Sequence, residues 1–98
     1  MYVVVEHQIK DPGTAFAKGE RLIRNQGAPA GVRGLQFYPS RDRSTVVCLW
    51  EAPSVVAVQE YVDGTLGDSS RNTCWEVDGA HAFARQPSGI AESPPEPE

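Results

Sequence analysis

Two different spacings of apolar residues run along the chain, and each predicts one kind of element. Four runs rich in β-branched and aromatic residues have the composition of strands. Two stretches between them carry apolar residues three, four or seven positions apart, as amphipathic helices do. The predicted strands cover 2–9, 32–39, 44–51 and 72–77, and the predicted helices cover 12–26 and 55–66.

Residues at the ends of both helical stretches support these limits. Asp11 and Ser54 stand where an N-cap is needed, because their side-chain oxygens accept hydrogen bonds from free amide groups of the first turn. Pro12 suits the first helical position, where its missing N–H does no harm, and Gly27 suits a left-handed helix terminator. The order of elements is therefore βαββαβ.

This order predicts an α+β, ferredoxin-like fold, with a four-stranded antiparallel sheet and two helices on one face. We expect one domain over residues 1–85. The fourth strand has an alternative end, in which it extends through residues 81–84 as an arm. Residues 86–98 are rich in Pro, Ser and Glu and are expected to be disordered.

Both faces of the predicted sheet carry apolar side chains. Val3 and Val5 alternate with Val4, and Val46 alternates with Val47 along the third strand. Because the two helices cover one face only, an isolated chain would expose the other to water. The pattern therefore predicts a homodimer that pairs through the open sheet faces.

Charge and hydropathy exclude several classes of partner. The 98-residue chain has a net charge of −4, and its arginines are scattered among acids, so no nucleic acid is expected as a partner. No apolar run approaches the roughly 20 residues that cross a bilayer, so no membrane partner is expected. Residues 1–10 lack the features of a signal peptide, and a cytoplasmic location is the expectation.

The strand order also constrains the cysteines and histidines. In the predicted sheet the first strand separates Cys48 from Cys74 by two strand spacings, too far for a disulfide, so both should be free thiols. Antiparallel pairing of strands one and four places His81 beyond the Met1 end of the sheet. His7 and His81 therefore cannot share a metal ion within one chain.

The strand-to-helix segment at 48–62 resembles a known group. Its sequence, CLWEAPSVVAVQEYV, is similar to that of small, largely uncharacterised bacterial domains of the dimeric α/β-barrel superfamily. In that family a third strand ends Cys-Leu-x-Glu-Ala-Pro-Ser and runs into a helix. The resemblance implies a ferredoxin-like homodimer with a cleft between sheet and helices.

One member of that family is described as nickel-binding, through histidines on the first strand and the second helix. This chain keeps His7 but has Gln8 beside it, and it has Tyr61 and Val62 on the helix. Most of that ligand set is therefore absent, so no metal ligand is assigned.

The candidate catalytic residues are His7, Tyr38 and Glu51, with His7 as the acid or base. Cys74 is expected close to His7. Glu51 is either paired with Arg33 or Gln36, or is a strand-end charge in water. Residues expected to place a ligand carry amide or aromatic side chains. They are Gln8, Gln36, Trp50, Trp75 and Tyr61.

Each of these residues also has a purely structural interpretation. A lone histidine on a strand is more often part of the packing, and the aromatic side chains are more often core or dimer filler. The amides of Gln8 and Gln36 could bridge two protomers.

Three functions follow as hypotheses. The first is a homodimer with an apolar pocket that binds or transforms a hydrophobic small molecule without an organic cofactor, as cyclases, isomerases or monooxygenases of the superfamily do. The second is binding of nickel or another divalent metal by His7 with carboxylates and partner-chain groups. The third is a dimerisation module without catalysis.

Overall fold

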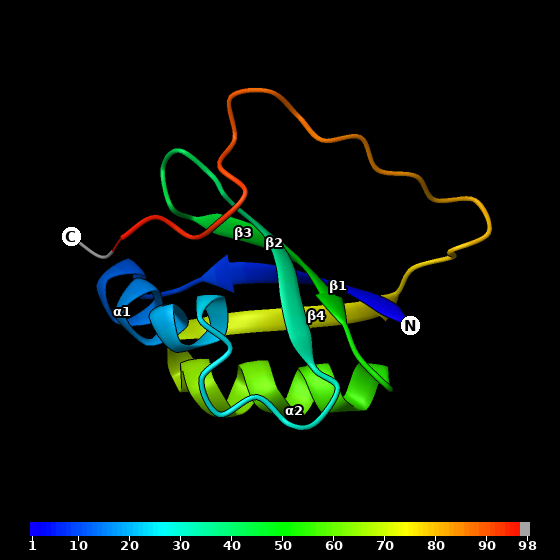
Figure 1. Ribbon diagram of the computed structural model, residues 1–98. Helices are drawn as coiled ribbons and strands as arrows, with labels where there is room; N and C mark the ends of the chain where they lie inside the picture. The colour runs from blue at the N-terminus through cyan, green and yellow to red at the C-terminus, as the bar shows by residue number, and fades with distance from the viewer. Residues whose placement is uncertain (97–98) are drawn as a thin grey trace.

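The computed structural model describes residues 1–96, which form one sheet and two α-helices (Figure 1). The element order is βαββαβ, with one short 3₁₀ turn, η1, before the last strand. The elements are β1 (Tyr2–Ile9), α1 (Pro12–Ile23), β2 (Arg33–Pro39), β3 (Thr45–Glu51), α2 (Val55–Leu66), η1 (Gly67–Ser69) and β4 (Ser70–Glu76).

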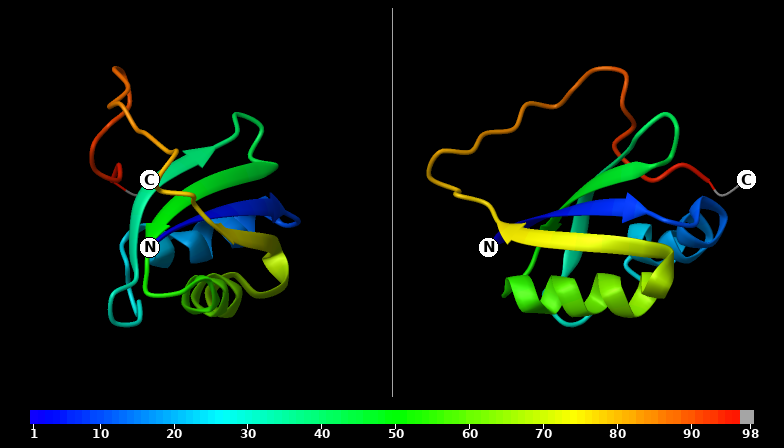
Figure 2. Two further views of the ribbon diagram at one scale, coloured as in Figure 1. Left: turned by 90° about the vertical axis from the view of Figure 1, so that its right-hand side faces the viewer. Right: turned by 180° about the vertical axis from the view of Figure 1, so that it is seen from behind.

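The four strands lie in the order β2-β3-β1-β4, and every neighbouring pair is antiparallel. Both helices lie on one face of this sheet, and within residues 1–96 no helix lies on the opposite face (Figure 2). The predicted α+β, ferredoxin-like fold is confirmed. Because β1 is central, its residues are paired on both sides and form the most constrained part of the molecule.

Both helices begin where their caps predict. The side chain of Asp11 accepts a hydrogen bond from the amide of Thr14, and that of Ser54 accepts one from the amide of Ala57. Helix α1 ends at Ile23, earlier than a terminator at Gly27 would give. The reason is that Asn25 already adopts a left-handed conformation, with φ of 55°.

Strand β4 begins at Ser70, two residues before the predicted start, because its pairing with β1 extends to Ile9. The alternative arm over residues 81–84 is wrong, since this segment is neither helix nor strand. The amide of Val77 donates to the carbonyl of Tyr2, close to the N-terminal end of β1.

The core lies between the sheet and α2. Val3 and Val5 of β1 point to the helices and pack with Val58 and Val62 of α2, and these four side chains are fully buried. Trp50 of β3 completes this layer and is 2% exposed. The spacing of the two α2 valines therefore locates the buried face of the helix as the sequence predicts.

The opposite face of the sheet keeps large apolar groups in contact with solvent. Val4 pairs with Leu49 on one side and Trp75 on the other, and Glu6 pairs with Val47. Trp75 is 45% exposed and Val47 is 36% exposed. We call the side of the sheet that carries these side chains the open face.

The segment after β4 arcs away from the sheet on the side opposite α2 and then returns towards α1 (Figures 1 and 2). It forms neither helix nor strand up to residue 96. The disorder expected for 86–98 stays a prediction, and its last two residues lie outside the described part of the chain. Among residues 1–96, no helix is long and apolar enough to span a bilayer.

Candidate functional site

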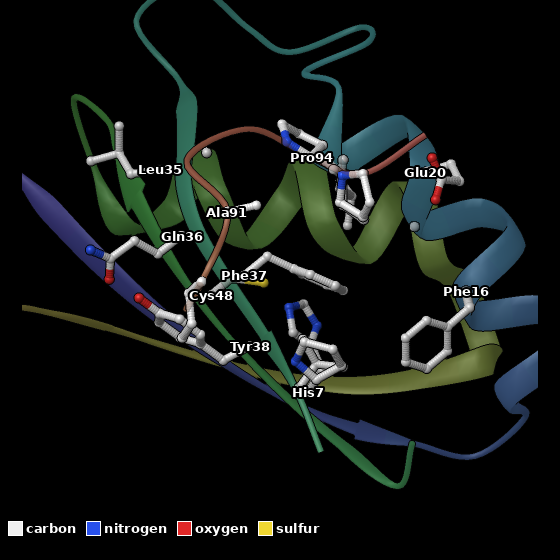
Figure 3. A pocket seen from close by; sticks show the side chains of 18 of the residues that line it. His7, Phe16, Glu20, Leu35, Gln36, Phe37, Tyr38, Cys48, Ala91 and Pro94 are labelled. Atoms are coloured by element: carbon white, nitrogen blue, oxygen red, sulfur yellow. The ribbon is translucent and has the colours of Figure 1, made fainter. Parts of the chain in front are cut away.

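A pocket of about 750 Å³ lies at the β2 edge of the sheet, between the sheet and α1. His7, Phe16 and Phe37 line it, with the segment that carries Ala91 and Pro94 crossing beside them (Figure 3). The rings of Phe16 and Phe37 meet edge to face, with centroids 6.5 Å apart. The remaining sheet and helix side chains in its wall are largely apolar and include Ile9, Leu22, Val46 and Cys48.

His7 is the titratable group that the sheet presents to this pocket from β1, and it is 2% exposed. Its Nδ1 lies 2.7 Å from Oδ1 of Asn72, the residue directly opposite it on β4. Within residues 1–96, Nε2 of the same ring has no hydrogen-bond partner. The strand register thus pairs Nδ1 of His7 with Asn72 and leaves Nε2 free to interact with a molecule in the pocket.

A chain of hydrogen bonds sets the orientation of Asn72. Its Nδ2 donates to Oδ1 of Asp63 on α2 at 2.9 Å, and the hydroxyl of Ser70 donates to its Oδ1 at 2.7 Å. A carboxylate accepts only, so the amide nitrogen must face Asp63 and the amide oxygen must face His7. His7 Nδ1 therefore carries a hydrogen, and in the neutral ring Nε2 is an acceptor.

Gln59 fixes the other end of this chain. Its Nε2 donates to Oδ2 of Asp63 and to the backbone carbonyl of Asn72, each at 3.0 Å. Gln59 and Asp63 are one helical turn apart on α2, so both reach the same stretch of β4. The network joins α2, β4 and β1 and holds the imidazole of His7 in one orientation.

Burial lowers the pKa of His7 below its ordinary value of 6.5. Loss of hydration is the largest cause, and the hydrogen bond that His7 donates to Asn72 and the negative charge of Asp63 oppose it in part. His7 is therefore neutral at pH 7. A neutral imidazole with a free Nε2 can accept a proton or a hydrogen bond from a molecule in the pocket.

Three other sequence-predicted residues line the same pocket as His7. Gln36 and Tyr38 contribute from the edge strand β2, and Trp50 contributes from β3. Tyr38 pairs with Val47 and Gln36 pairs with Leu49, so both belong to the exposed side of β2 rather than to the layer of His7. They are at the rim of the pocket, and His7 is at its base.

Glu51 lies apart from His7. It is five positions along β3 from Val46, the residue that pairs with His7, which is about 17 Å along a strand. Its carboxylate accepts a hydrogen bond from Nη2 of Arg33 at 3.3 Å, which is one of the two expected pairings. Both side chains are substantially exposed, and they line a separate, shallow hollow of about 380 Å³. The grouping of Glu51 with His7 and Tyr38 in one catalytic cluster does not occur.

Tyr61 supports the wall of the pocket from behind. Its ring stands perpendicular to that of Trp50, with centroids 5.7 Å apart, and its hydroxyl donates to the carbonyl of Gln26 at 2.6 Å. The other ring edge of Trp50 approaches Gly34, where an added Cβ would lie 3.3 Å from the indole. Trp50 is thus clamped between α2 and β2, and Tyr61 does not line the pocket itself.

Gln8 and Trp75 belong to the open face, on the other side of the sheet from His7. Gln8 neighbours His7 in sequence, and successive strand residues point to opposite faces. Trp75 pairs with Val4 of the open face. The structure therefore does not bring either residue to the pocket.

The two cysteines flank Val5, which pairs with Cys48 on one side and with Cys74 on the other. Both are free thiols, as the strand order predicts. Burial raises the pKa of Cys48 to about 12 and that of Cys74 to about 11. Cys74 lies two pairs along the ladder from His7, and Asn72 is the residue directly opposite His7.

Among residues 1–96, no three His, Cys, Asp or Glu side chains gather into a group that could hold a metal ion. The side-chain amide of Asn72 lies between His7 and the carboxylate of Asp63. An amide is a poor substitute for an imidazole or thiolate as a metal ligand. The site is therefore organised around a single nitrogen acceptor.

Sequence reasoning identified His7 and missed Asn72, Asp63 and Gln59. The strand register was the feature that could have identified Asn72, because antiparallel pairing of β1 with β4 sets Asn72 opposite His7. That register depends on where β4 begins, which the sequence pattern placed two residues too late.

No protein-family model and no curated protein sequence matches this chain. Among solved structures, it is similar to the one described as "Structure of Rv0793 from Mycobacterium tuberculosis". The two share 20% sequence identity, over 81% of this chain and 97% of the other, with a TM-score of 0.49. The fold is assigned here from the element order and the strand pairing of the chain itself.

Proposed function

We propose that the pocket binds a hydrophobic small molecule that carries one hydrogen-bond-donating or weakly acidic group, and that His7 Nε2 accepts its hydrogen. One observation carries this proposal. A neutral imidazole is fixed by Asn72 in a single tautomer, with its free nitrogen at the base of an apolar pocket.

The pocket supports a ligand of this class in size and composition. Its volume of about 750 Å³ is within the range of small-molecule sites, and a mostly apolar wall with a few convergent polar groups is typical of them. Phe16 and Phe37 offer ring faces and edges to an aromatic or alicyclic ligand.

Proton transfer is the chemistry that these side chains favour. His7 acts as the base, and the guanidinium of Arg43, which lies 5.0 Å above the ring of Phe16, supplies positive charge to the anion that forms. Neither the removal of the proton nor the stabilisation of the anion needs an organic cofactor. Isomerisation and cyclisation begin with such a step, and so does monooxygenation of a phenol-like substrate in which dioxygen is the oxidant.

In the proposed function the protein acts as a homodimer, and its two chains pair through the open face. Val4, Val47, Leu49 and Trp75 form an apolar surface there, and no helix covers it. Pairing two such faces removes this surface from water and leaves the pockets, which lie on the helix side, outside the dimer interface.

A titration with 2-naphthol tests the proposal, because this probe is an aromatic ring system with a single hydroxyl group. Amide chemical shifts of the ¹⁵N-labelled protein should change around β2 and α1. His7→Phe, which keeps a ring but removes the acceptor, should weaken binding about fivefold, since a buried hydrogen bond is worth on the order of 1 kcal/mol. Asn72→Ala should weaken it by a smaller factor, because the ring then loses its fixed orientation.

The matched control is His81→Gln, which removes the other histidine. His81 is bonded to Asp78 at 2.8 Å in the exposed segment after β4, outside the pocket. Its substitution should leave the affinity unchanged. Equal affinity of the wild-type protein and His7→Phe would refute the role of His7, and shift changes confined to other surfaces would refute the site.

A further inference from the structure

The C-terminal part of the chain returns to the fold at the pocket. After leaving β4, it arcs away and comes back beside α1 and β2 (Figures 1 and 2). Residues 86–95, which we call the strap, supply much of the pocket's lining opposite the sheet. The strap residues that line it are Gln86, Pro87, Ile90, Ala91, Glu92, Ser93, Pro94 and Pro95.

One charged side chain holds the far end of the strap. Nη2 of Arg24 donates to the carbonyl of Pro95 at 2.8 Å, while its Nε contacts Oε2 of Glu20 at 3.2 Å. Glu20 is one helical turn before Arg24, so it fixes the direction of the guanidinium. The bond joins Arg24, the residue directly after α1, to a residue 71 positions later in the sequence.

The composition of the strap suits an extended segment that docks on aromatic side chains. Pro94 and Pro95 favour a polyproline II conformation, which loses little entropy when it docks on aromatic side chains. Ile90 and Ala91 are its apolar side chains, and Phe16 and Phe37 line the same pocket. Glu92 adds negative charge to a pocket that Arg43 lines.

We infer that the strap is a movable outer wall of the pocket, which must move aside before a molecule from solution can reach His7. The strap is bound weakly enough to dissociate from the fold. Each of its residues is more than a third exposed, and one hydrogen bond from a side chain, that of Arg24, anchors it. The preceding residues, 77–85, form neither helix nor strand and act as the tether. A tether of this length keeps the strap at a local concentration in the millimolar range.

The inference goes beyond the proposed function and does not depend on it. A strap that is closed about 90% of the time reduces the apparent affinity of any pocket ligand about tenfold, whatever the chemistry at His7. Its removal therefore raises affinity, whereas loss of the acceptor at His7 lowers it.

Amide NMR of the protein alone tests the docking. Deletion of residues 86–98 should change the shifts of β2 and of the second half of α1, and leave β4 unchanged. Heteronuclear relaxation in the full-length chain should show residues 90–95 more rigid than residues 79–83. The core lies within residues 3–66, so the shortened chain should fold.

Two single-residue variants of the full-length chain, Arg24→Ala and Arg21→Ala, form a matched pair for the same amide NMR measurement. Arg24→Ala removes the donor to Pro95 and should reproduce the shift changes of the deletion. Arg21→Ala removes an arginine of the same helix whose side chain does not line the pocket, and it should reproduce none of them. Arg21 is exposed, so its loss leaves the core intact.

Binding of Nile red, an uncharged apolar dye, measures the effect on the pocket. The shortened chain should bind the dye about tenfold more tightly than the full-length protein. A synthetic peptide of residues 86–98, added at millimolar concentration, should displace the dye from the shortened chain.

The inference is overturned if deletion shifts only amides next to the new C-terminus, or if residues 90–95 relax like a free tail. Equal dye affinity for the two chains would overturn it as well. None of these three results would decide whether His7 accepts a hydrogen from 2-naphthol, so a failure of the strap inference and a failure of the proposed function are distinguishable.

Discussion

At the scale of single residues, His7 is where opposite effects compete most directly. Loss of hydration disfavours the imidazolium, while Asn72 and the charge of Asp63 favour it. Burial is the larger effect, so the neutral ring is the native form. An acceptor that stays unprotonated at pH 7 is what a base in an apolar pocket requires.

This balance predicts how stability depends on pH. The pKa of His7 is lower in the folded chain than the ordinary value of 6.5, so the unfolded chain binds more protons between the two values. The free energy of unfolding should therefore be constant above pH 6.5, as far as His7 is concerned, and should fall as the pH drops from 6.5 through the folded pKa.

Urea unfolding between pH 5 and 7.5 measures this effect, with His7→Gln as the comparison. Glutamine can still donate to Asn72 but does not titrate, so the variant should lack this part of the decline. Asp11 and Asp42 do not obscure it, because hydrogen bonds lower the pKa of both carboxyls below 3.8. Identical pH profiles of the two proteins would contradict the prediction.

The sequence indicated His7 as a candidate and gave Arg33 as one of two alternative partners of Glu51, since both inferences depend on strand alternation or on strand ends. It could not predict the partner of His7, because a shift of one residue in register exchanges Asn72 for a neighbour with a different side chain. Cys74 was expected close to His7, and it lies two pairs away along the same ladder. Trp75 and Gln8 were assigned by residue type alone, and the face on which each lies removes them from the pocket.

At the scale of elements, local signals are reliable where the chain itself supplies the hydrogen-bond partner. Helix α2 has its predicted bounds, because Ser54 caps it and the repeat of buried valines continues to Leu66. The start of β4 was placed too late because a tertiary contact determines it. The amides of Lys10 and Asp11 donate to the carbonyl of Ser69, which sets the register of the next residue against β1.

Removal of the α2 cap gives a measurable loss. Ser54→Ala eliminates the acceptor for the Ala57 amide and should lower the free energy of unfolding by about 1 kcal/mol. Ser54→Asp keeps an acceptor and should be close to wild type. Chemical denaturation at pH 7 compares the three proteins, and an alanine variant as stable as wild type would show that the cap contributes nothing.

The strand order predicts the behaviour of the thiols. In denaturant without reductant, two thiols per chain should react with Ellman's reagent, because β1 separates Cys48 from Cys74. In the folded protein at pH 8 the reaction should be slow, since thiolate is scarce when the pKa values are about 12 and about 11.

A count of no thiols in denaturant would contradict this strand order. A non-reducing gel is the control, since it separates a bond within the chain from one between chains. Rapid reaction in the folded state would instead show that the thiols are accessible.

At the scale of the whole molecule, the two faces of the sheet have different environments. One packs on two helices and holds the pocket, and the other keeps Trp75 and Val47 at the surface. The general arrangement follows from the βαββαβ order, which sequence periodicity was sufficient to predict. The path of residues 86–96 was not predictable, because a Pro-rich segment has no period that indicates where it docks.

The proposed homodimer predicts a mass of twice 10.7 kDa in light scattering. Val47→Glu places a charge in the open face and should reduce the mass to that of one chain. Val56→Glu is the matched control, because Val56 is 62% exposed on α2, away from that face, and its substitution should leave the dimer intact. A wild-type mass of one chain at micromolar concentration would refute the pairing.

The two tryptophans divide the molecule in a way that experiments can use. Trp50 is buried beside the pocket, against the ring of Tyr61, and Trp75 lies on the open face. Their intrinsic emission therefore differs in colour: that of Trp50 should be blue-shifted, and that of Trp75 red-shifted by water. A Trp75→Phe variant would report events at the pocket alone, and a Trp50→Phe variant would report whether the open face becomes dry.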